Sequence, residues 1–148
     1  MNGDLHMGRL RWWHLPVVAR MERAVFGPEA WSEGLLWTEL AAGHDYRAVL
    51  SGEFVLGYAG VALTGHEAWI NNIAVDPSMR RRGIATMLMD DLIARARAGG
   101  AKAVFLEVAV DNGPAQRLYD RYGFYGIGVR KNYYQFTGTD AAVMRMDL

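Results

Sequence analysis

The segment from Ala103 to Val110 constrains the fold of this sequence more than any other. It reads Ala-Val-Phe-Leu-Glu-Val-Ala-Val, an almost continuous apolar run between the turn signals Gly99-Gly100 and Asp111-Asn112-Gly113-Pro114. A strand with one wet face alternates apolar and polar residues, whereas a strand covered on both faces does not. The segment therefore predicts a strand in the middle of a sheet that carries helices on both of its faces.

A helical pattern precedes this strand. Apolar residues recur at every fourth position, with Met87 and Ile93 beside them; they are Ile84, Leu88, Leu92 and Ala96. This spacing is typical of an amphipathic helix. Two earlier helices are expected over Leu15–Val25, with Pro16 in the first turn, and over Glu33–Ala42, capped by Ser32. A short helix is expected from Asn112 to Tyr122.

The remaining apolar and β-branched segments predict strands. They are His6–Trp12, Tyr46–Leu50, Phe54–Leu63, Ala68–Val75, Tyr125–Asn132 and Ala141–Met146. Strands cluster early, helices alternate with strands in the middle, and a hairpin ends the chain. We therefore expect one α/β (α+β) domain over residues 1–148, with a mixed sheet between two layers of helices.

The composition excludes several classes of protein. Lys+Arg and Asp+Glu balance at 16 each, which gives no general attraction to nucleic acid or an anionic membrane. The chain has no cysteine, so disulfides and thiolate nucleophiles are excluded, and its four histidines show no metal-ligand spacing. No apolar run approaches the ~20 residues of a membrane span. We expect a cytoplasmic protein without a metal, as a monomer or weak homodimer.

Three arginines, Arg80 to Arg82, come just before Gly83 and the predicted helix. A helix N-terminus offers free N–H groups and a partial positive charge, and glycine lets the backbone approach a phosphate closely. The amides from Arg81 to Thr86 are therefore a candidate pyrophosphate site. A solvated basic turn before an ordinary helix explains the same residues equally well.

Glu107 is the one charged residue of the central apolar strand. An unpaired carboxylate inside a sheet is costly, so Glu107 either lies at the open end of the strand or serves a purpose there. A carboxylate at a strand end is a sound candidate for a general base. The alternative is a structural glutamate paired with an arginine such as Arg117.

Other polar and aromatic residues carry weaker signals. Tyr119 lies on the short helix after Asn112, where a phenol can act as general acid but more often only packs. Asn112 is most simply a helix cap. Paired asparagines form strands poorly, so Asn71 and Asn72 predict a bulge or exposed backbone near a ligand.

The order of these parts resembles the GNAT superfamily of N-acetyltransferases. The resemblance rests on Asn72-Ile73-Ala74-Val75-Asp76-Pro77, Arg80-Arg81-Arg82-Gly83-Ile84-Ala85, Leu106-Glu107-Val108, Asn112, Leu118-Tyr119 and Tyr122-Gly123-Phe124. Features of its RimI branch, which acetylates the N-terminal alanine of a ribosomal protein, are Trp31-Ser32-Glu33, Arg130-Lys131-Asn132-Tyr133-Tyr134, Asp140-Ala141 and Met144-Arg145.

This resemblance implies a mostly antiparallel sheet of six to seven strands, acetyl-CoA as the acyl donor, and a protein N-terminus as the acceptor. It implies that Glu107 is the general base and that Tyr119 is the acid that protonates the leaving thiolate. The implied contacts to the cofactor are Ile73, Ala74, Val75, Arg81, Arg82, Gly83, Ile84, Ala85, Thr86 and Asn112. The pair Tyr133 and Tyr134 would line the groove for the peptide.

Related sequences often carry an arginine where this one has Ala109, which weakens any inference about the charge of the peptide. Two other functions stay open at this point. The chain could acetylate lysine side chains or a small amine, or it could bind coenzyme A as a regulatory module without turnover. An assay of peptides that begin with alanine separates all three.

Overall fold

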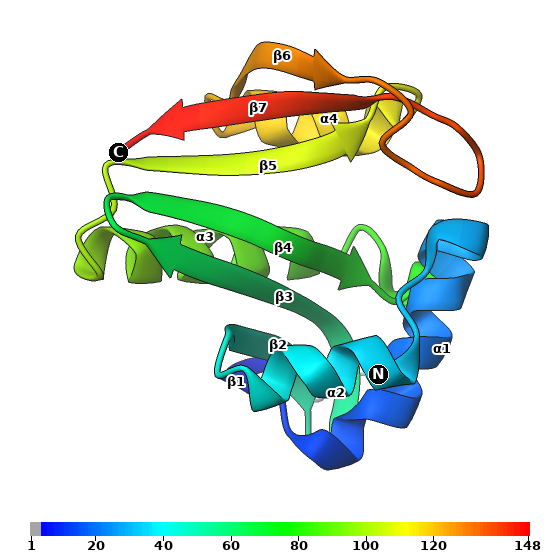
Figure 1. The fold of residues 1–148 in the computed structure, drawn as a ribbon. Helices are drawn as coiled ribbons and strands as arrows, with labels where there is room; N and C mark the ends of the chain where they lie inside the picture. The colour runs from blue at the N-terminus through cyan, green and yellow to red at the C-terminus, as the bar shows by residue number, and fades with distance from the viewer. Residues whose placement is uncertain (1–3) are drawn as a thin grey trace.

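The computed structural model describes residues 4–148, which form one seven-stranded sheet and four α-helices (Figure 1). The strands are β1 (His6–Arg9), β2 (Asp45–Ser51), β3 (Phe54–Thr64), β4 (Glu67–Val75), β5 (Ala103–Ala109), β6 (Tyr125–Arg130) and β7 (Ala141–Asp147). The helices are α1 (Leu15–Phe26), α2 (Glu33–Ala41), α3 (Ile84–Ala98) and α4 (Gly113–Arg121). The predicted fold class is confirmed.

One predicted boundary is wrong. The sequence predicts a first strand that reaches Trp12, but β1 ends at Arg9, and Trp12–His14 form a 3-10 turn that leads into α1. The N–H of Arg11 donates to Nδ1 of His14 at 2.9 Å, so a local side chain takes the place of a strand partner. Aromatic residues favour strands on average, and this local hydrogen bond overrides that preference.

The strand order is β1-β2-β3-β4-β5-β7-β6. Among the described strands, β4 and β5 are the one parallel pair, and every other neighbouring pair is antiparallel. The apolar strand β5 therefore lies inside the sheet, as its sequence predicts. The last two strands, β6 and β7, form the predicted hairpin.

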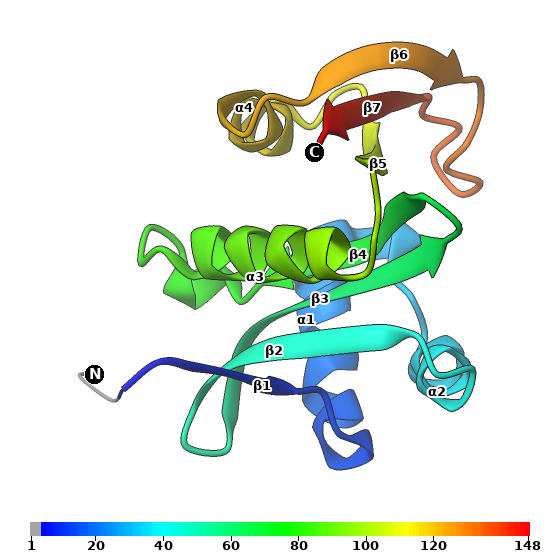
Figure 2. The ribbon, with the colours of Figure 1, turned by 90° about the vertical axis from the view of Figure 1, so that its left-hand side faces the viewer.

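Helices cover both faces of the sheet, α1 and α2 on one and α3 and α4 on the other (Figure 2). Because side chains alternate between the two faces of each strand, the sheet has a hydrophobic core on either side. Val104, Leu106 and Val108 of β5 belong to the core on the side of α3 and α4. Among the helices of residues 4–148, none combines the length and the apolar character that a membrane crossing requires.

The close approach of α3 to the sheet depends on Gly57 in β3. A Cβ atom at this position would lie 2.9 Å from Cγ2 of Ile84 and 3.1 Å from the carbonyl oxygen of Ala74. Any larger residue would push the first turn of α3 away from β3 and β4. The glycine thus fixes where the N-terminus of α3 begins relative to the end of β4.

The two central strands, β4 and β5, stay paired over only a short stretch. Residues Glu67–Trp69 pair with Ala103–Phe105, where the rings of Trp69 and Phe105 stack with centroids 4.8 Å apart. Beyond this point the strands have no further pairing, although β4 continues to Val75 and β5 to Ala109. The two strands diverge beyond this point (Figure 1), and we call the region between their unpaired backbone edges the opening.

Candidate functional site

The N-terminus of α3 has the features of an anion site. Gly83 is its N-cap residue, with a φ of 76°, and Arg81 has a φ of 64°. No side chain caps this end of the helix, and its first turn contains no acidic residue. Alternating backbone conformations of this kind turn successive N–H groups toward a common point, which suits a phosphate oxygen.

The three arginines before α3 are exposed. Within residues 4–148 none of their guanidinium groups forms an ion pair. They add positive charge to the helix N-terminus without a protein anion to neutralise it. The predicted loop from Arg81 to Thr86 therefore fits the pyrophosphate of a coenzyme A molecule.

The strand β4 carries a bulge at the predicted asparagines. Gly60 of β3 pairs with Asn72, and the next residue, Val61, pairs with Ile70, so Asn71 is the extra residue. A bulge of this kind turns two successive side chains to the same face of the sheet. Both asparagines face the helices α1 and α2, as the following contacts show.

Carboxylates from these two helices hold the bulge. Glu22 of α1 accepts a hydrogen bond from Nδ2 of Asn72 at 2.6 Å, and Glu39 of α2 accepts one from Nδ2 of Asn71 at 3.4 Å. The sequence predicts the bulge but not its partners. Glu22 follows Leu15 by seven residues and Val18 by four, so the helical period places it on the buried face of α1, but no local pattern reveals its partners.

Beyond the bulge, the backbone of β4 alternates between β3 and the opening. The N–H of Asp76 donates to the carbonyl of Leu56 at 2.9 Å, so Asp76 faces β3. Because bonded groups alternate along an antiparallel strand, the backbone of Ala74 also faces β3, and that of Ile73 and Val75 faces the opening. The side chain of Ala74 is buried in the core. Ile73 and Val75 thus have the geometry that suits the arm of a cofactor.

Glu107 lies on the other side of the opening, on β5, with its side chain 19% exposed. Its Oε2 is 3.1 Å from Nε of Arg130 on β6. The alternative partner considered from the sequence, Arg117, is wrong: its guanidinium lies over the first turn of α4, near Gly113. Burial, with the charge of Glu107 and a hydrogen bond to it, raises the pKa of the Tyr133 phenol.

Tyr119 is buried on α4, with 6% of its surface exposed and its ring edge-on to Phe124 at 5.7 Å between centroids. Burial is the main cause that raises the pKa of Tyr119, and the nearby Tyr134 adds to it. The phenol therefore keeps its proton at any working pH. Side chains alternate along β5, so Glu107 projects from the face opposite α4. The two predicted catalytic residues therefore lie on opposite faces of the sheet.

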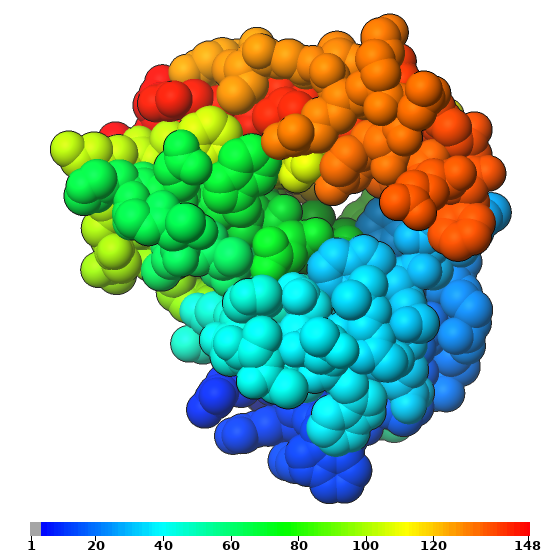
Figure 3. Space-filling model, in the orientation of Figure 1, coloured from blue at the N-terminus to red at the C-terminus, as the bar shows by residue number. Residues whose placement is uncertain are grey.

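Tyr134 lies near both of these residues. Burial raises its pKa to about 12, helped by the charges of Tyr133, Glu107, Glu29 and Asp111. Glu29, between α1 and α2, also accepts a hydrogen bond from the N–H of Thr137 at 2.8 Å. This contact joins the loop between β6 and β7 to the turn after α1, next to a hollow in the molecular surface (Figure 3).

Asn112 caps α4, as its position in the sequence predicts. Its Oδ1 accepts a hydrogen bond from the N–H of Ala115 at 3.2 Å. The cap orients the first turn of α4 and thereby the helix that carries Tyr119. Contact with a cofactor stays a prediction for Asn112.

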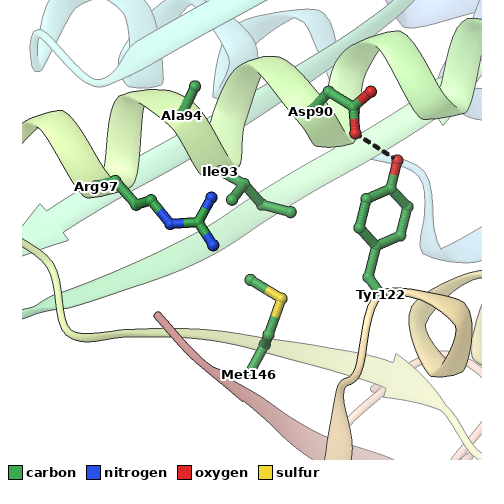
Figure 4. A pocket seen from close by; sticks show the side chains of 6 residues that line it. All are labelled: Asp90, Ile93, Ala94, Arg97, Tyr122 and Met146. Carbon is green, nitrogen blue, oxygen red and sulfur yellow. Dashed lines mark hydrogen bonds between the residues drawn. The ribbon is translucent and has the colours of Figure 1, made fainter.

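A separate cavity of about 340 Å³ lies between α3 and the end of β7 (Figure 4). Its lining includes Asp90, which accepts a hydrogen bond from the Tyr122 hydroxyl at 2.8 Å, and Arg97. None of the predicted site residues lines it. Within residues 4–148 no group of three or more His, Asp or Glu side chains is arranged to hold a metal ion.

Comparison with known proteins identifies the family. The Acetyltransferase (GNAT) family matches residues 11–124. The N-alpha-acetyltransferase RimI of Mycobacterium tuberculosis is 38% identical over 135 residues, which cover 87% of this chain and 84% of that protein. A putative [ribosomal protein bS18]-alanine N-acetyltransferase of Bacillus subtilis is 32% identical over 128 residues, or 81% of this chain and 85% of that protein.

Solved structures agree with this assignment. The ribosomal-protein-S18-alanine N-acetyltransferase of Escherichia coli superposes with a TM-score of 0.85 at 27% identity, covering 97% of this chain and 94% of that chain. The resemblance seen in the sequence is therefore confirmed at the level of the family and its RimI-named members. This chain belongs to the Acetyltransferase (GNAT) family and is an acetyl-CoA-dependent N-acetyltransferase.

Proposed function

We propose that this enzyme acetylates the α-amine at the N-terminus of a protein, with a ribosomal protein that begins with alanine as its natural substrate. The observation that carries the proposal is the similarity, over more than four fifths of the chain, to proteins named for this reaction. We place the reaction in the cytoplasm, where ribosomal proteins are made.

The charges around Tyr134 support an amine as acceptor. Three carboxylates, Glu29, Glu107 and Asp111, act on this phenol, and Arg130 is the cation paired with one of them. An ammonium group is attracted to such a site, and an α-amine loses its proton easily because its ordinary pKa is near ~8. Tyr133 and Tyr134 would flank the entering N-terminus, and their perpendicular rings hold each other in place.

Glu107 is assigned the role of general base. Its partial exposure lets it take the amine's proton directly or through a water molecule, and the ion pair with Arg130 orients the carboxylate. Tyr119 is assigned the role of acid, because burial keeps its phenol protonated on the other face of the sheet. Acetyl-CoA, when bound, supplies the acetyl group as a thioester and leaves as a thiolate.

The remaining residues position the reactants. Ile73 and Val75 offer backbone groups to the pantetheine arm, and the N–H of Val75 is the candidate donor to the thioester oxygen. The amides from Arg81 to Thr86 are assigned to the pyrophosphate. Holding amine and thioester in one opening makes the attack effectively unimolecular, which supplies much of the rate.

The test uses peptides incubated with the enzyme and acetyl-CoA, followed by mass spectrometry to locate the acetyl group. We expect acetylation of the α-amine in a peptide that begins with alanine. The matched control is the same peptide with its α-amine blocked and an internal lysine left free, which should stay unmodified. Acetylation of only the lysine, or of polyamines and no peptide, would refute the proposed acceptor.

A further inference from the structure

A buried carboxylate in α1 stands behind the β4 bulge. Glu22 has no exposed surface, and its partners come from three different parts of the fold. Its Oε1 accepts a hydrogen bond from the N–H of Trp31 at 2.8 Å, and its Oε2 accepts from Asn72 and from the Tyr58 hydroxyl. A carboxylate removed from water is costly, so such complete partnering calls for an explanation.

The polarity of these hydrogen bonds fixes the orientation of Asn72. Its amide group donates to Glu22 and, at 2.9 Å, to the oxygen of Tyr58. A carboxylate accepts and cannot donate, so the amide nitrogen of Asn72 must point toward Glu22. The amide oxygen is then turned to the other side, where it accepts a hydrogen bond from the N–H of Ile73 at 3.0 Å.

The N–H of Ile73 is one of the backbone groups that face the opening. Asn72 covers it, so Val75 carries the next N–H along β4 that can reach a ligand. A chain of hydrogen bonds thus runs from the core of α1 to the surface that faces the acyl donor. Its direction is set at Glu22, which in its ionised form can only accept.

We infer that Glu22 is a positioning residue for acetyl transfer, which orients Asn72 so that β4 presents one defined set of backbone groups to the acyl donor. This inference rests on the proposed placement of the donor along Ile73 and Val75. It does not depend on which amine is the acceptor. The catalytic roles proposed for Glu107 and Tyr119 do not require Glu22. An experiment can therefore refute the positioning role of Glu22 without refuting those catalytic roles.

The variant Glu22→Gln tests the inference with little change in volume. Its new amide nitrogen would face the amide nitrogen of Asn72, so Asn72 would rotate and bring its own N–H₂ against the N–H of Ile73. We expect kcat to fall about tenfold, since about 1.4 kcal/mol of transition-state stabilisation corresponds to that factor. The dissociation constant of coenzyme A should change less than threefold, because the pyrophosphate loop is untouched.

A second substitution should reverse the effect. In Glu22→Gln with Asn72→Asp, one oxygen of residue 72 can accept from the new glutamine and the other from the N–H of Ile73. We expect kcat to return to within threefold of the wild type. The matched control is Glu33→Gln, which makes the same change at an exposed carboxylate of α2 and should leave kcat within twofold. Assays at pH 8.5 keep Glu22 ionised in the wild type.

Hydrogen exchange provides a readout that needs neither substrate. By NMR of the free protein, the Ile73 amide should exchange at least tenfold faster in Glu22→Gln than in the wild type, and the double variant should restore its protection. If Glu22→Gln does not fold, Asn72→Ala removes the same cover from Ile73 and should show the same loss of kcat. A folded Glu22→Gln or Asn72→Ala with wild-type kcat and Ile73 exchange would overturn the inference.

Discussion

The two sides of the opening between β4 and β5 are built differently. The β4 wall, formed by Asn71–Val75, is braced from behind by the carboxylates of Glu22 and Glu39. The β5 wall, formed by Glu107 and the Tyr133-Tyr134 pair, keeps its carboxylate partly exposed. The carboxylate of Glu22 behind β4 is fully buried, whereas the carboxylate of Glu107 on β5 stays partly accessible to water.

This difference separates two tasks that acetyl transfer requires. Binding a thioester arm needs backbone groups at fixed positions, and a braced strand provides them. Removing a proton from an amine needs a carboxylate that water and substrate can reach. The same residue type, glutamate, serves both walls, and its surroundings decide which task it can perform.

The largest expected effect comes from the β5 wall. Glu107→Gln should lower kcat/KM at pH 7 by about 100-fold or more, the usual contribution of a general base. Binding of acetyl-CoA, followed by calorimetry, should stay unchanged because β4 and α3 are intact. The deficit should shrink toward pH 9, where solvent has already deprotonated the amine. The same substitution at the exposed Glu53 is the control, and wild-type turnover of Glu107→Gln would remove Glu107 from the mechanism.

The buried carboxyl group of Glu22, behind the β4 wall, should make the free energy of unfolding depend on pH. Burial raises the pKa of Glu22 from 4.5 to about 7, and the hydrogen bonds from Trp31 and Asn72 only partly oppose it. The folded state therefore holds this proton more tightly than the unfolded chain does. The resulting stabilisation is complete below about pH 4.5 and is lost as the pH rises through about 7.

We expect the unfolding free energy of the wild type, relative to Glu22→Gln, to fall by about 3 kcal/mol between pH 4.5 and pH 8. Urea denaturation of both proteins at several pH values measures this difference and cancels the groups they share. If the unfolding free energies of the two proteins change with pH in parallel, the pKa of Glu22 is not raised by burial. The predicted difference between the β4 and β5 walls would then disappear.

These two glutamates also mark what the sequence can and cannot predict. Glu107 stands out because it interrupts an apolar strand, and local patterns of this kind predict the four α-helices and the seven strands, but not the 3-10 turn at Trp12–His14. Glu22 interrupts the apolar face of α1 in the same way, but its partners Tyr58 and Asn72 lie 36 and 50 residues away, so no local pattern predicts them. The partner of Glu107 is likewise set by the strand order, because β6, which carries Arg130, lies two strands away from β5, whereas Arg117 lies on α4.

A smaller effect is expected from the opposite face of the opening. Tyr119→Phe keeps the buried ring beside Phe124 and removes only the hydroxyl. We expect kcat to fall about 10- to 100-fold, since a hydrogen bond to a charged group contributes about 1.5–3 kcal/mol. Tyr125→Phe is the matched control, because its hydroxyl bonds Asp147 at the end of β7, and its activity should stay within twofold. If the two variants are equally active, Tyr119 is not the acid that protonates the leaving thiolate.

The smallest expected effect concerns the start of α3, which borders the β4 wall. Gly83 has a φ of 76°, and a Cβ there would touch nothing within 4 Å, so Gly83→Ala introduces backbone strain without a clash. A side chain in this conformation costs about 1–2 kcal/mol, which the loop can relieve by rotating its N–H groups away from the pyrophosphate. We expect the dissociation constant of coenzyme A to rise about five- to tenfold, equivalent to about 1–1.4 kcal/mol.

Gly65 offers a matched control for this prediction. It lies in the turn between β3 and β4 with a φ of 62° and equally open surroundings, so Gly65→Ala carries the same strain far from the start of α3. Thermal unfolding should show similar losses of stability for both variants, whereas calorimetry with coenzyme A should separate them. If both bind coenzyme A as the wild type does, the anion site is not at this helix, and the β4 wall would have to hold the cofactor by its strand alone.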